Sequence, residues 1–111
     1  MNVNYKSIDF DKLTRADTIS VQTMKSSYQF SVLDPCNRKG LLSGGSLGDY
    51  AIEAFLSGMV SDDRDFDTAE LKTGGRAVFF IESSKTVRRL ITSVVTDLTV
   101  VRIPASRTPR V

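Results

Sequence analysis

Hydrophobic positions in this chain gather in short runs separated by polar turns, most clearly in its last third. Residues 76–81 read Arg-Ala-Val-Phe-Phe-Ile, residues 87–92 read Val-Arg-Arg-Leu-Ile-Thr, and a third run spans 95–103. β-Branched and aromatic residues dominate these runs, and no helical period survives in them. The pattern therefore predicts a meander of three antiparallel strands within residues 74–103.

The first half of the chain carries a second strand signal. Ile19, Val21 and Thr23 alternate with polar residues, and after a polar turn the alternation resumes at Tyr28, Phe30 and Val32. A period of two is typical of strands with one buried face. We expect a hairpin over residues 18–32, a surface turn over 34–40, and a brief strand before the glycine-rich loop that ends at Asp49.

Two segments have no clear period. In residues 50–59, Ile52, Ala54 and Leu56 fit a strand, whereas Ile52, Phe55, Leu56 and Met59 fit a helix. Gly58 and the strand-rich surroundings favour the strand. Residues 1–17 are polar and acidic, and either a short helix near residues 9–15 or an irregular lead-in fits them.

These segments predict an all-β fold of six or seven strands with at most one short helix. A small antiparallel β-barrel is preferred over a two-layer β-sandwich, because closing the sheet satisfies strand edges that few helices could cover. A faint repeat at a spacing of 58, residues 13–21 against 71–79, fits two hairpins closing such a barrel. We expect a single domain over residues 1–103 and a flexible tail over 104–111.

Composition narrows the chemistry available to the chain. It has no histidine and no tryptophan, and Cys36 is its single cysteine. Histidine-based acid–base catalysis, Cys/His zinc sites and intrachain disulfides are therefore unavailable. No apolar run approaches a membrane span. We expect a cytoplasmic, non-enzymatic protein that needs no cofactor and does not bind membranes.

Charge is unevenly distributed. Residues 1–70 hold seven Lys/Arg and eleven Asp/Glu, net −4, whereas residues 71–111 hold eight and two, net +6. The simpler interpretation is that the acidic and basic halves lie side by side and partly neutralise each other. The sharper one is a basic surface for an anionic partner, with an outward Phe80 stacking on a base and four arginines on phosphates. The candidate binding residues are Arg76, Phe80, Arg88, Arg89 and Arg102.

The glycine-rich segment 40–49 offers a second candidate site. Backbone amides at Gly44 and Gly45 could converge on an anion beside Arg38 and Lys39. The segment matches neither of the common glycine-rich phosphate-binding motifs, and a mobile hairpin or a bulge is the structural alternative.

Alternating aspartates in the acidic stretch 62–67 resemble a calcium loop. Thr68 stands where the turn glycine belongs, and Gly74 stands where the bidentate glutamate belongs. We therefore expect no metal site.

The leading functional hypothesis is a non-catalytic protein-interaction or self-assembling module. A nucleic-acid-binding barrel that uses the basic meander is the first alternative. A small-anion or ligand site at Gly40–Asp49 is the second.

Overall fold

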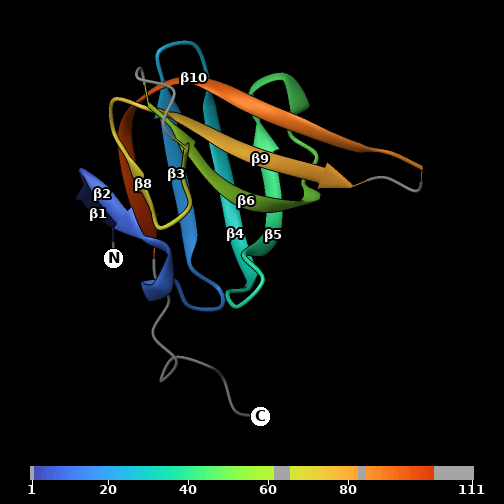
Figure 1. Ribbon diagram of the computed structural model, residues 1–111, viewed down its shortest axis with the longest axis horizontal. Helices are drawn as coiled ribbons and strands as arrows, with labels where there is room; N and C mark the ends of the chain where they lie inside the picture. Colours follow the sequence, from blue (N-terminus) through green and yellow to red (C-terminus); the bar gives the residue numbers. More distant parts are fainter. Residues whose placement is uncertain (1, 62–65, 83–84, 102–111) are drawn as a thin grey trace.

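A computed structural model describes residues 2–61, 66–82 and 85–101 of the protein. The described residues form strands and two short 3-10 turns, which confirms the all-β class (Figure 1). In chain order the elements are β1 (Asn2–Tyr5), β2 (Ser7–Asp9), η1 (Phe10–Lys12), β3 (Thr18–Thr23), β4 (Ser27–Asp34), β5 (Lys39–Gly44), η2 (Gly45–Leu47), β6 (Ile52–Val60), β7 (Phe66–Asp67), β8 (Glu70–Lys72), β9 (Arg76–Glu82) and β10 (Val87–Val101).

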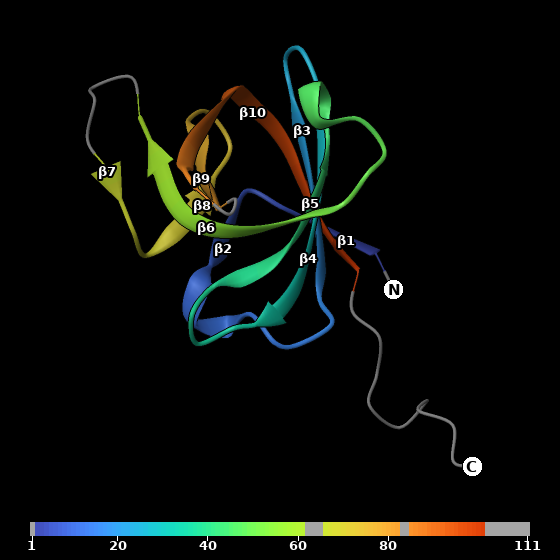
Figure 2. The ribbon, with the colours of Figure 1, turned by 90° about the vertical axis from the view of Figure 1, so that its right-hand side faces the viewer.

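The main sheet closes on itself. Antiparallel pairs join β3 to β4, β4 to β5, β5 to β6, β6 to β9, β9 to β10 and β10 back to β3. Figure 2 shows β6 sweeping away from β5 towards the other side of the ring, where it ends beside β7. Closure gives each ring strand a partner on both sides over part of its length, as the prediction of a closed sheet required.

β10 makes closure possible because it changes partner along its length. Its first part pairs with β9 and its second part with β3, with register shifts between Ile91 and Val94 and between Val95 and Asp97. At the first shift, the buried Thr92 hydroxyl accepts from the Ala77 amide (3.0 Å) and donates to the Ser93 carbonyl (2.7 Å). A side chain thus satisfies a backbone group where the ladder is interrupted. Residues 87–101 therefore form one bent strand, where the sequence predicted two strands over 87–92 and 95–103.

The core lies inside the ring. Ile19 and Val21 from β3, and Phe30 from β4, are almost fully buried, as the alternating sequence pattern predicts. Phe30 and Phe79 meet with ring centroids 5.5 Å apart and planes tilted by 49°. Offset aromatic pairs of this kind add to the free energy of burying the rings.

A small second sheet covers one end of the ring. β2 pairs with β8, which places Ile8 opposite Leu71, and both side chains are buried. The Phe10 amide continues this pairing by donating to the Ala69 carbonyl (2.9 Å). The polar residues 1–17 thus contain two strands, β1 and β2, and the 3-10 turn η1. The sequence predicted a short helix or an irregular segment there and neither strand.

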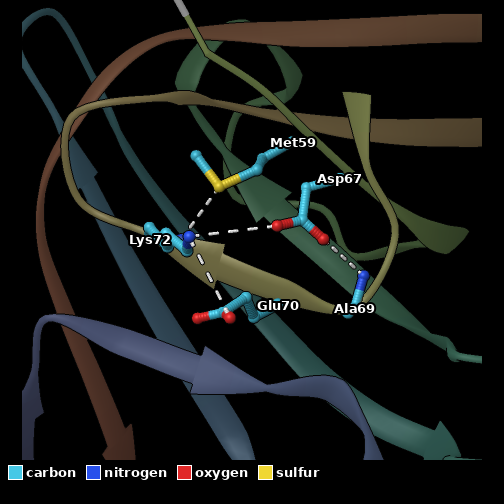
Figure 3. A network of polar contacts seen from close by, with 5 residues as sticks. All are labelled: Met59, Asp67, Ala69, Glu70 and Lys72. Carbon is cyan, nitrogen blue, oxygen red and sulfur yellow. Dashed lines mark hydrogen bonds and ion pairs between the residues drawn. The ribbon is translucent and has the colours of Figure 1, made fainter. Parts of the chain in front are cut away.

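A polar network fastens β8 to β6 and β7 (Figure 3). The Lys72 amide donates to the Met59 sulfur (3.1 Å), and the Lys72 ammonium lies 4.0 Å from carboxylate oxygens of both Asp67 and Glu70. Asp67 also accepts from the Ala69 amide (2.8 Å). Because these ion pairs are long and partly exposed, they orient the β7–β8 connection more than they stabilise it.

The faint repeat has a structural counterpart. Ala16 and Gly74 are equivalent at the spacing of 58, and both have positive φ, 74° and 94°. Each occupies a turn that leads into a ring strand, β3 or β9. Only this turn and the following strand are shared, because Leu71 lies in a strand and Leu13 does not.

Other expectations meet a mixed outcome. Residues 52–60 form strand β6, so the strand interpretation of that segment is confirmed. No helix among the described residues is long and apolar enough to cross a membrane. The tail expected over 104–111 lies outside the described residues.

Candidate functional site: the outer face of β6, β9 and β10

β9 separates an inner from an outer set of side chains. Ala77, Phe79 and Ile81 point into the core. The alternate positions face outwards from the ring and run in the order Arg76, Val78, Phe80 and Glu82. We call the surface that these four residues form with their neighbours on β6 and β10 the outer face.

Cross-strand pairing assembles an aromatic and cationic row on this face. Phe80 lies directly opposite Phe55 on β6 and Arg89 on β10. Phe55 in turn lies opposite Lys39 on β5, whose ammonium stands 6.0 Å from the Phe55 ring centroid and 3.3 Å from Glu53. Directly opposite residues are the closest side-chain neighbours in an antiparallel sheet. The row therefore places two aromatic rings between two cations.

Beside this row lies an open groove of about 420 Å³. Val78 faces Ile91 across β9 and β10, and Val78 is only 2% exposed although it lies outside the main core cluster. Phe66 and Ile91 remain 51% and 44% exposed. Apolar side chains predominate in the lining, which consists of Ser57, Val60, Phe66, Val78, Phe80, Arg89 and Ile91.

A glycine brings Phe66 into the groove. The β6–β9 register shifts between Leu56 and Gly58, and a Cβ at Gly58 would collide with the Asp67 carbonyl oxygen and lie 3.1 Å from the Phe66 ring. Only glycine permits β7 to approach β6 this closely. The bulge at Gly58 thus fixes one wall of the groove.

Three of the five predicted binding residues share the outer face. Arg76, Phe80 and Arg89 lie on it, and Phe80 is the outward member of the adjacent phenylalanine pair, as expected. Arg88 lies on the opposite face of β10, across from the inward-facing Ile81. Arg102 is outside the described residues.

The structure does not bring the four candidate anion-binding residues together. Lys39 begins β5, whereas Gly44 ends it, roughly 16 Å away for an extended strand. The Gly44 amide donates to the Gly48 carbonyl (2.8 Å), and a Cβ at Gly45 would collide with the Tyr28 ring. The glycines therefore close a turn and make room for a buried tyrosine.

Arg38 also has internal partners. Its guanidinium donates to the Thr68 carbonyl (2.6 Å) and lies 4.7 Å from the centroid of the Phe10 ring. These contacts tie the β4–β5 turn to η1 and to the connection between β7 and β8 and point the charge away from the glycine turn.

The outer face carries charges of both signs. Arg76 and Arg89 are exposed cations, and Glu82 and Glu53 are exposed anions on the same side of the sheet. Within the part of the chain that the structure describes, no group of three or more Cys, Asp or Glu side chains could hold a metal ion. The face is therefore an apolar surface with a mixed charged rim.

Sequence reasoning named Phe80 and Arg89 among its candidates, without separating Arg89 from Arg88, and missed most of the groove. Phe66 was assigned to an acidic loop, and Val78 could not be separated from the core by composition. The missed signal was Gly58, because a glycine in a strand indicates a bulge or a close backbone approach.

Comparison of this chain with models of known protein families, with curated proteins and with solved structures finds no match.

Proposed function

We propose that this protein is a non-catalytic protein-interaction module and that the outer face binds another protein chain. The observation that carries the proposal is the groove between β6, β7, β9 and β10. Its apolar walls include the half-exposed Phe66 and Ile91 at the surface of a sheet that already has a separate, well-packed core. Grouped exposed apolar side chains ringed by polar ones are typical of protein-binding surfaces.

The residue types at the groove support a protein partner. Phenylalanine and arginine are enriched in the centres of protein interfaces, and Phe80 beside Arg89 supplies both. A partner would bury apolar side chains in the groove.

Single-stranded nucleic acid is the competing partner, because the Phe80–Arg89 pair could also stack a base and hold a phosphate. The rim weakens this alternative. Glu82 and Glu53 share the face with Arg76, Arg89 and Lys39, so a polyanion would meet repulsion as well as attraction. A non-enzymatic role is part of the proposal because the sequence has no histidine.

Site-specific photo-crosslinking in living cells tests the proposal. A benzoylphenylalanine replaces Ile91 in the groove or, as a control, Leu33. Leu33 is matched in exposure, 40% against 44%, and lies on β4, which is three strands from β9 in either direction around the ring. We expect discrete protein adducts from position 91 and none from position 33.

The adduct's composition decides between partners. A nuclease-sensitive adduct at position 91 would favour nucleic acid and contradict the proposal. Equal labelling from both positions, or none from position 91, would also contradict it.

A further inference from the structure

We propose that the chain bound by the outer face is a second copy of the same protein, packed through β9 about a two-fold axis. This inference rests on the proposed function and names its partner. It follows from the order of charges along the outer side of β9.

The outer side of β9 is self-complementary. It begins with a cation at Arg76, continues through the apolar Val78 and Phe80, and ends with an anion at Glu82. When two such faces meet with their strands antiparallel, each Arg76 comes opposite Glu82 of the other copy. The apolar centres then meet each other between the two charge pairs.

Only one orientation has this property. A two-fold axis that lies between the two sheets, parallel to their planes and perpendicular to β9, places Arg76 of each copy over Glu82 of the other. An axis parallel to β9 would place Arg76 over Arg76 and Glu82 over Glu82, which repel. Sheets packed face to face cross at about 30°. This angle displaces Arg76 sideways from Glu82 of the other copy, and the long arginine and glutamate side chains can span that displacement.

The neighbouring strands agree with this orientation. The same axis brings β10 over β10, so that Arg89 of one copy lies over Ile91 of the other and away from the other Arg89. This follows because Arg89 pairs with Phe80 and Ile91 pairs with Val78, on opposite sides of the axis. The half-exposed Ile91 and Phe66 side chains would lose their contact with water.

Charge-swap complementation tests the interface. Arg76→Glu and Glu82→Arg are made singly, and the dissociation constants of dimers are measured by sedimentation for each variant alone and for the equimolar mixture. Both side chains are exposed, and the Arg76 guanidinium donates a long hydrogen bond to the Thr92 carbonyl (3.4 Å). Arg15→Glu, at an exposed turn before β3, is the control with the same charge change as Arg76→Glu.

We expect each single variant to weaken dimerisation at least about tenfold, because each reverses two charge pairs. The mixture restores it to within about threefold of wild type. In the mixed dimer, the glutamate introduced at position 76 of one copy faces the arginine introduced at position 82 of the other. The native Glu82 and Arg76 form the second pair. Arg15→Glu leaves dimerisation unchanged.

Three results would overturn the inference: a wild-type protein that stays monomeric up to about 1 mM, single variants that dimerise like wild type, or a mixture that dimerises as weakly as its components. The proposed function is judged separately. A position-91 adduct to a different protein would leave that function standing while removing the second copy as its partner.

Discussion

Phe79 and Phe80 are neighbours on β9 that point to opposite faces of the sheet. Phe79 is fully buried against Phe30 inside the ring, whereas Phe80 lies half-buried on the outer face opposite Arg89. One strand therefore serves the core with one side and the proposed interface with the other.

Truncating each phenylalanine should separate these two roles. Phe79→Ala should lower the free energy of unfolding by about 3–5 kcal/mol, because it empties a close-packed site. Phe80→Ala should cost about 1 kcal/mol or less and should weaken dimerisation instead. Urea unfolding and sedimentation on the two variants measure both effects. Similar stability losses in the two would contradict this division.

Gly45 and Gly48 form a second matched pair. Both have positive φ, 54° and 77°, so alanine is strained at either position. A Cβ at Gly45 would also strike the ring of the buried Tyr28, whereas a Cβ at Gly48 would meet nothing within 4 Å. Gly45→Ala should therefore destabilise the fold by at least about 1 kcal/mol more than Gly48→Ala. Thermal unfolding of both variants measures this difference. Equal losses of stability would contradict a collision between the Gly45→Ala side chain and the Tyr28 ring.

Arg38 should behave as a structural residue. Arg38→Ala removes the hydrogen bond to Thr68 and the contact with the Phe10 ring, and should cost about 1 kcal/mol of stability. Lys39→Ala removes a partly exposed ion pair with Glu53 and a 6.0 Å contact with the Phe55 ring, and should cost about 0.5 kcal/mol or less. Denaturant titration of each variant measures the difference. A phosphate-dependent gain in stability that is lost in both variants would instead support the anion site.

Asp34 should titrate below its ordinary range. Its hydrogen bond from the Asn37 side chain, followed by that from the Asn37 amide, lowers the pKa of this carboxyl from the usual 3.8. Since the folded-state pKa is depressed, the stabilisation is present above pH 3.8 and is lost as the pH falls through the folded value. Carbon-detected NMR titration should show Asn37→Ala moving the midpoint upwards towards 3.8. An unchanged midpoint would contradict the assigned cause.

Alternation predicted the elements whose two faces differ most. β3 and β4 could be identified because Ile19, Val21 and Phe30 recur at a period of two. The bend in β10 could not, because Thr92 and Ser93 look like a break between strands until the Thr92 hydroxyl is seen to satisfy the Ala77 amide.

The end sheet and the groove depended on long-range contacts. Ile8 is one apolar residue in a polar segment, and only its pairing with Leu71 makes it part of the core. Phe66 likewise reads as a loop residue until Gly58 allows β7 to lie close to β6. The candidate surface was therefore half predictable, through Phe80 and Arg89, and its groove was not.

A dilution series followed by NMR tests the central claim most directly, because it maps self-association onto individual residues. As the concentration of the unmodified protein rises, we predict progressive shifts at outer-face positions such as Phe80, Glu82 and Ile91, with Leu33 on β4 unchanged. Spectra that do not change with concentration, or shifts centred on β4, would contradict the account.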